Sequence, residues 1–214
     1  MKTISYSLAA FAALLISSGC SRDSEPTAEA VSQQGAEPRT NEAAREAPPN
    51  AGVEAGALRL VVDRSERALY VHRGAEVVRT HPVAIGKPEH QTPSGSWRIY
   101  KIDLNPEWIP PDSDWARDRE RKAPGDPNNP MGRARLIFDP PYSIHGTEAL
   151  DSLGSAASHG SIRVANPVVV ELARLLLQAG GGWEGEAWFQ ERLNQRTEMT
   201  EITLDRPVEI EVRP

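Results

Sequence analysis

The 214-residue sequence has a single cysteine, Cys20, and few aromatic residues. One cysteine excludes a disulfide within the chain and a zinc site built on several thiolates. The five histidines show no His-x-x-x-His spacing, so we expect no metal and no cofactor. If Cys20 is removed or lipidated, the folded part has no thiol, and any covalent catalysis there must use an oxygen nucleophile.

The sequence also has no excess of basic residues. The net charge is -6, the isoelectric point is near 5.5, and Lys and Arg are scattered along the chain. We therefore expect no nucleic-acid partner. Hydrophobic residues make up only 39%, and the shortfall lies mostly between residues 21 and 56, where Ala, Glu, Pro, Ser and Gln dominate. We predict that 21–56 is a disordered linker, because it cannot bury enough apolar surface to offset its ordering entropy.

The first 20 residues have the layout of an export signal. Lys2 precedes a short apolar run from Leu8 to Ile16, which is too short to span a bilayer as a finished helix. Gly19 before Cys20 resembles the bacterial lipobox, in which the cysteine is diacylated and becomes the mature N-terminus. We predict a lipoprotein-type signal over 1–20 and a lipid-anchored envelope protein facing the periplasm or cell wall. The alternative is an ordinary signal peptide that is cut nearby.

The remaining residues, 57–214, have the pattern of a folded domain that is mostly β with one or two helices. Residues 105–133, rich in Pro, Asp, Asn and Gly, form a long loop typical of a lid or binding loop. Asn166 and Pro167 predict the N-cap and first turn of a helix that ends near Ala179, and a second helix is expected over 184–194. Strands are predicted over 58–62, 68–72, 77–85, 97–102, 135–138, 142–145, 200–204 and 208–212.

One stretch, from His145 to Asn166, concentrates the residues that could do chemistry. It contains His145-Gly-Thr and, after a gap, Ser158-His-Gly-Ser161-Ile-Arg163. Gly160 allows a tight turn that could present Ser161 to a substrate, and a histidine near such a hydroxyl is the minimal arrangement for acyl transfer. A polar turn with capping residues is the other explanation of so short a match.

The longer pattern resembles the signature of the L,D-transpeptidase (YkuD-type) catalytic domain. Further resemblances are Ile85-Gly-Lys-Pro, the segment 91–99 with Trp97, and Pro127-Asn-Asn-Pro-Met-Gly132. The resemblance covers residues 57–212 and implies a β-sandwich-like fold. It departs from the family at one position, because the family nucleophile is a cysteine and this chain has Ser161.

The resemblance implies attack on a peptidoglycan stem tetrapeptide, at the L-centre carbonyl of a meso-diaminopimelic or similar diamino acid residue. The terminal D-Ala leaves, and an amine of a second stem takes the acyl group. The roles that the resemblance implies are nucleophile for Ser161, general base and acid for His145, oxyanion support by His159, Gly160 and nearby N–H groups, orientation of the loop or a substrate carboxylate by Arg163, and a hydrogen bond to an imidazole from Ser158.

The serine changes the chemistry that His145 must perform. A cysteine thiol has a pKa of about 8.5 and readily forms a thiolate, whereas a serine hydroxyl must lose its proton during the attack itself. Two functions stay open: a lipid-tethered, monomeric acyltransferase that uses serine in wall crosslinking, and an inactive relative that binds peptidoglycan or a wall enzyme as a scaffold. The partners expected are peptidoglycan stem peptides and the membrane, through a lipid on Cys20.

Overall fold

The computed structural model describes residues 56–214. The predicted signal, Cys20 and nearly all of the predicted linker lie outside the described residues and stay predictions. Within 56–214, no helix is both long enough and apolar enough to cross a membrane.

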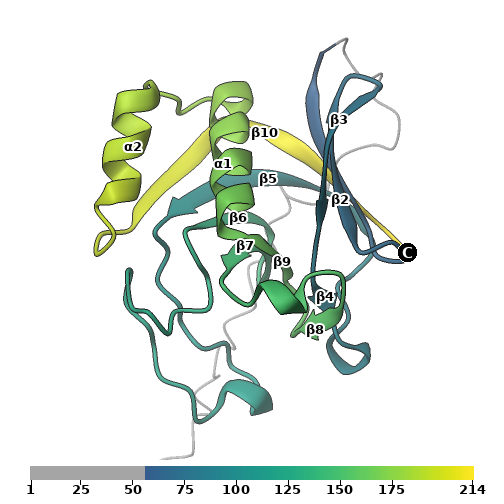
Figure 1. Cartoon of the computed structure of the whole chain (residues 1–214), viewed down its shortest axis with the longest axis vertical. Coiled ribbons are helices and arrows are strands. Elements are labelled where there is room, and N and C mark those ends of the chain that lie inside the picture. Colours follow the sequence, from purple (N-terminus) through teal and green to yellow (C-terminus); the bar gives the residue numbers. More distant parts are fainter. Residues whose placement is uncertain (1–55) are drawn as a thin grey trace, which may run out of the picture. The chain divides into compact units, whose positions relative to one another are not determined.

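A mixed sheet of eight strands makes up most of the structure (Figure 1). Neighbouring strands run antiparallel except for two parallel pairs, one at the centre of the sheet and one at its edge. This arrangement, with two helices, confirms the prediction of a mostly β domain. In sheet order the strands are β3 (Glu76–Pro82), β2 (Ala68–Arg73), β1 (Leu58–Asp63), β10 (Thr200–Arg213), β5 (Gly95–Leu104), β6 (Ala134–Asp139), β7 (Tyr142–Thr147) and β9 (Ile162–Ala165).

Helix α1 (Asn166–Gly180) lies along the sheet and contacts β6, β7, β9 and β10, with α2 (Glu186–Asn194) beyond it (Figure 1). Apolar residues repeat at helical spacing on the face of α1 that meets the sheet, which removes them from water. Val168 and Leu175, at the margin of this face, are only half-buried. The fully buried apolar residues of α1 are Val169, Leu172, Ala173, Leu176 and Leu177.

The predicted N-cap of α1 is wrong. Ala165 occupies the cap position without a side-chain hydrogen bond, and Asn166 is already the first helical residue. The Asn166 side chain instead accepts from the Arg133 N–H at 2.8 Å and donates to Glu148 at 2.7 Å. It therefore fixes the end of the long loop, where Gly132 comes too close for any side chain, against the strand–helix junction.

Two differences from the predicted strands affect the site. The two strands expected near the C-terminus are one strand, β10, with a register shift between Thr203 and Val208 that accommodates Pro207. Two short strands flank the Ser161 turn and were not predicted. These are β9 and β8 (Ala156–Ser158), and β8 pairs with β4 (Ile85–Gly86) in a separate two-stranded sheet.

Candidate active site

A cavity of about 1110 Å³ lies over the face of β5, β6, β7 and β9 and beneath the loop 105–133. Five of the six site residues predicted in the domain line it, and the sixth, Gly160, shapes the turn between them. Trp108 and Trp115 of the loop are among the lining residues. The lining residues from the motif are His145, Ser158, His159, Ser161 and Arg163.

His145 is positioned as a neutral base. Its Nδ1 lies 2.9 Å from the Gly146 carbonyl oxygen, which can only accept, so Nδ1 carries the proton of the neutral ring and Nε2 has none. Burial lowers the pKa of His145 to about 4, and the nearby charges of Arg163 and Arg135 add to that shift. Backbone hydrogen bonds to Gly146 and Pro130 raise the pKa of His145 but do not overcome burial. The imidazole is therefore uncharged at neutral pH.

Ser161 ends the turn that leads into β9, the strand next to His145. In the parallel pair β7 and β9, Ile144 pairs with Ile162 and His145 with Arg163, so Ser161 immediately precedes the first paired residue of β9. Ser161 is two residues before Arg163, the partner of His145, so all three side chains project from the same face, and all three line the cavity.

The turn before Ser161 requires glycine. Gly160 has a φ of +110°, and a Cβ placed there would lie 2.6 Å from the Tyr142 ring. Its N–H donates to the Ser158 hydroxyl at 3.1 Å, and that hydroxyl donates to the Ser161 carbonyl at 2.5 Å. Ser158 thus holds the turn and not an imidazole, contrary to prediction. The Gly160 N–H is already in use, so the prediction that it is an oxyanion donor is not supported.

Thr92 was not predicted, yet it ties the turn to the rest of the domain. Its buried hydroxyl donates to the Gly160 carbonyl at 2.7 Å and accepts from the Gly86 N–H at 2.9 Å. A sequence signal existed, because Thr92 lies within the segment 91–99 that carries the family resemblance. Arg163 is fixed from the same side by two backbone hydrogen bonds to Ala84, at 2.8 and 3.0 Å.

His159 contacts the loop and not the base. Its ring stacks on Trp115 with centroids 3.9 Å apart and planes 10° apart, and His90 lies 5.0 Å away. Burial, followed by the charges of Lys87 and His90, lowers the pKa of His159. His159 therefore helps to join the loop to the Ser161 turn, and the described residues include no hydrogen bond between it and His145.

A row of ionisable side chains crosses the cavity floor, and its arrangement was not predicted. Its members are direct register partners on five adjacent strands, so their side chains project from the same face. All of them line the cavity. In order from β10 to β9 they are Glu201, Asp103, Arg135, His145 and Arg163. In the sequence, these charges occupy the polar positions of alternating strands and look like solvent-facing residues.

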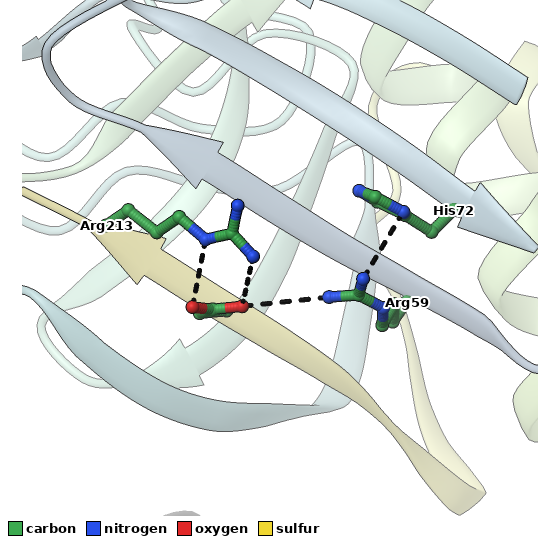
Figure 2. Close-up of polar contacts among 4 residues, drawn as sticks. Arg59, His72 and Arg213 are labelled. Atoms are coloured by element: carbon green, nitrogen blue, oxygen red, sulfur yellow. Dashed lines mark hydrogen bonds and ion pairs between the residues drawn. The ribbon is translucent and has the colours of Figure 1, made fainter. Parts of the chain in front are cut away.

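A second cluster of ionisable side chains lies on β1, β2 and β10 (Figure 2), and none of its residues lines the cavity. Arg213 makes two hydrogen bonds to Glu211, at 2.9 and 3.0 Å, and Arg59 lies 3.6 Å from the same carboxylate. Arg59 Nη2 is also 3.4 Å from His72 Nδ1. Burial first, and then the two arginine charges, lower the pKa of His72. Nothing in residues 56–214 forms a group of three or more metal-ligating side chains.

Comparison with known proteins identifies the family of the domain that contains this site. Residues 57–210 match the YkuD family model, the L,D-transpeptidase catalytic domain. The chain belongs to this family. The matched range begins at β1 and ends within β10, so it contains the whole row of ionisable side chains and the Ser161 turn.

Individual relatives of this L,D-transpeptidase-family chain are distant. "Probable L,D-transpeptidase YbiS" of Escherichia coli strain K12 is 30% identical over 115 residues, which cover 50% of this chain and 38% of that protein. "Probable L,D-transpeptidase ErfK/SrfK" of Salmonella typhimurium is 30% identical over 116 residues, covering 50% and 37%. The chain thus matches less than two-fifths of the length of either relative. The catalytic domain of the E. faecium L,D-transpeptidase aligns with 74% of this chain and 98% of that domain, at 13% identity and a TM-score of 0.48.

Proposed function

We propose that this chain is a serine-dependent acyltransferase that acts on peptidoglycan stem tetrapeptides and crosslinks the cell wall. The observation that carries the proposal is the state of His145. It is buried and uncharged, its Nδ1 proton is held by the Gly146 carbonyl, and its ring lines the same cavity as Ser161. A serine hydroxyl needs a base in this form, because its proton leaves during the attack.

In the first half-reaction, the Ser161 oxygen attacks the carbonyl carbon of the third residue while His145 Nε2 takes the hydroxyl proton. The Gly146 carbonyl stabilises the imidazolium that forms. Collapse of the tetrahedral intermediate breaks the C–N bond to the terminal D-Ala, whose amine receives that proton from His145. The product is an ester between the shortened stem and Ser161.

In the second half-reaction, an amine of another stem attacks the ester carbonyl and passes a proton to His145. The C–O bond breaks, and Ser161 regains its proton. Water in place of the amine gives hydrolysis by the same steps. Negative charge on the intermediate would be stabilised by the Ser161 N–H and by the half-buried Arg163, whose guanidinium has no hydrogen-bond or ion-pair partner among the described residues.

The second candidate is an inactive relative that binds stem peptides or a wall enzyme. One observation favours it: the Gly160 N–H, which would otherwise be an oxyanion donor, is engaged by the Ser158 hydroxyl. Each lost oxyanion donor costs roughly 10²–10³ in rate. Such a protein would still present the cavity and its charged floor to a ligand.

Intact-protein mass spectrometry distinguishes the two candidates. The protein is incubated with tetrapeptide muropeptides beside Ser161→Ala and Ser161→Cys variants. An adduct and released D-Ala with the native chain, both absent from Ser161→Ala, support serine catalysis. Reaction of the Ser161→Cys variant alone assigns the chain to the binding candidate, and no reaction from any form leaves only the fold in common with the family.

We also propose that the protein is exported and held at a membrane by lipid on Cys20, facing the periplasm or cell wall. Two acyl chains give stable anchoring without a transmembrane helix. Metabolic labelling with palmitate tests this directly. Label is expected on the native chain and not on a Cys20→Ala variant, and label that survives the substitution rejects the anchor.

A further inference from the structure

We propose that a second cavity, formed mainly by the loop 105–133, binds the sugar to which the acylated stem is attached, with the sugar ring against Trp115. The proposal rests on the proposed function, because a stem peptide held in the cavity over His145 decides where the sugar lies. The ligand is an N-acetylated amino sugar of the glycan chain, a part of the substrate that takes no part in acyl transfer.

The second cavity has a volume of about 780 Å³ and is lined by residues 110–119 of the loop together with His90. This volume is typical of a site for a small ligand. Five residues line both this cavity and the first one, over His145, and they form a ridge between the two. The ridge consists of Pro111, Asp112, Ser113, Trp115 and Arg119. A ligand that continues from the first cavity past this ridge enters the second.

Trp115 gives the ridge an aromatic surface. Its ring stacks on His159, with centroids 3.9 Å apart and planes 10° apart, so one ring face is covered. Trp115 is nevertheless only half-buried, and it lines both cavities. Because the stack already holds the indole in place, a ligand does not have to order it. A pyranose ring presents C–H groups on its faces, which pack against an indole, and polar groups around its edge.

The ridge also offers polar groups for that edge. Asp112 and Arg119 are exposed, and neither side chain has an ion pair or hydrogen bond among the residues that the structure describes. A carboxylate only accepts and a guanidinium only donates, so together they suit hydroxyl and acetamido groups, which do both. Asp114 and Arg117, which line only the second cavity, form an ion pair with each other. With two acidic and two arginine side chains, the lining favours a neutral polar ligand over an anion or a cation.

The length of the stem agrees with the position of the ridge. When the third-residue carbonyl is at Ser161, three residues separate it from the bond to the sugar, which is about 10 Å in an extended peptide. On the protein, Ser161 and His159 are two residues apart, at most about 7 Å, and the Trp115 ring stacks on His159. The sugar of a bound stem therefore lies within reach of Trp115.

The test measures binding without turnover, by isothermal titration calorimetry on the full chain with Ser161→Ala. Two ligands are compared, the disaccharide-tetrapeptide and the same tetrapeptide with an acetyl cap in place of the sugars. We expect the disaccharide ligand to bind at least about tenfold more tightly, because one hydrogen bond to a charged group alone contributes about that factor.

Variants of the ridge then locate the preference. Adding Trp115→Leu should abolish it, and adding Asp112→Ala or Arg119→Ala should lower it at least about threefold. The last two remove exposed side chains without partners, so they test the subsite even if the Trp115→Leu loop does not fold. Arg73→Ala is the matched control, because Arg73 is an exposed arginine of β2 that lines neither cavity and should leave the preference unchanged.

Two results would overturn the sugar subsite. One is a disaccharide ligand that binds no more tightly than the capped tetrapeptide, including the case in which neither binds. The other is an equal loss of affinity for both ligands in every ridge variant, which would mean that the ridge only shapes the first cavity. Failure of the proposed chemistry looks different. A chain that forms no adduct through Ser161 can still prefer the disaccharide ligand, and a chain that forms the adduct without this preference retains only the proposed function.

Discussion

Thr92 and Gly160 are joined by a buried hydrogen bond across 68 positions of sequence, from the threonine hydroxyl to the glycine carbonyl at 2.7 Å. The same hydroxyl accepts from Gly86, so one side chain satisfies two backbone groups behind the Ser161 turn. The position of Ser161 thus depends on a residue that does not itself line the cavity.

Replacing Thr92 with Val should leave both backbone groups without a partner. We expect the free energy of unfolding to fall by about 1–3 kcal/mol and the rate of acylation to fall with it, because the turn is no longer held. Chemical denaturation and adduct formation measure the two effects. Thr92→Ser keeps the hydroxyl and should retain most of both. Equal losses in Thr92→Val and Thr92→Ser would mean that the methyl group, and not the hydrogen bond, is what matters.

Gly160→Ala should be more damaging than the same change at Gly154. Both glycines have positive φ, +110° and +80°, but a Cβ at Gly160 meets Tyr142 while one at Gly154 has nothing within 4 Å. We expect a loss of about 1 kcal/mol at Gly154 from backbone strain alone, and about 2 kcal/mol or more at Gly160 together with loss of acylation. Thermal unfolding of the two variants side by side measures the difference, and similar values would contradict this account of the turn.

The pH dependence of acylation should show that the base has an unusually low pKa. Because the pKa of His145 in the free protein is about 4, kcat/KM should stay level down to about pH 5 and fall only below it. An ordinary histidine would begin to lose activity near pH 6.5. A stopped-flow pH profile with the tetrapeptide substrate distinguishes the two. An acid limb centred near 6.5 would mean that the cavity hydrates His145 before reaction.

The cluster in Figure 2 predicts a contribution of His72 to acid sensitivity. Burial and the neighbouring arginines lower the pKa of His72 in the folded chain, so the unfolded chain binds the proton more readily. The stability that comes from keeping His72 neutral is therefore present above about pH 6.5 and is lost as the pH falls towards the lower folded value. Urea unfolding of His72→Gln between pH 5 and 7 should show a shallower pH dependence than that of the native chain. If the pH dependence of the free energy of unfolding is unchanged in His72→Gln, His72 does not contribute to acid sensitivity.

The pattern of the sequence predicts most of the fold. Alternating apolar residues predict the hairpin of β1 and β2, and Pro167 with a helical repeat predicts α1, because both signals are local. The joining of two predicted strands into β10 could not be predicted, because a proline such as Pro207 usually interrupts a strand. Here β10 pairs with β5 on both sides of Pro207. The strands β8 and β9 are only three and four residues long and form only against partners distant in sequence.

For the site, the motif predicts His145, Ser161 and Arg163 in one cavity, and the structure brings them there. What the motif cannot give is the partner of each polar group. Asparagine is a common N-cap residue, but the buried Asn166 side chain instead accepts a hydrogen bond from Arg133. Ser158 likewise donates to the Ser161 carbonyl and not to a histidine ring. Asp103 and Arg135 could not be predicted as cavity residues, because only the strand register aligns them in one row with His145.

The place of β10 in the sheet also sets an order for folding. β10 is the only strand between β1 and β5, and it pairs Leu60 with Ile210, about 150 residues away in sequence. During synthesis, the β1–β3 hairpins therefore have no central neighbour until almost the whole domain has been made. Contacts at such long separation slow the folding of a domain. The chain would leave the ribosome without a completed sheet, and an unfolded chain of this kind can still be exported as an extended polypeptide.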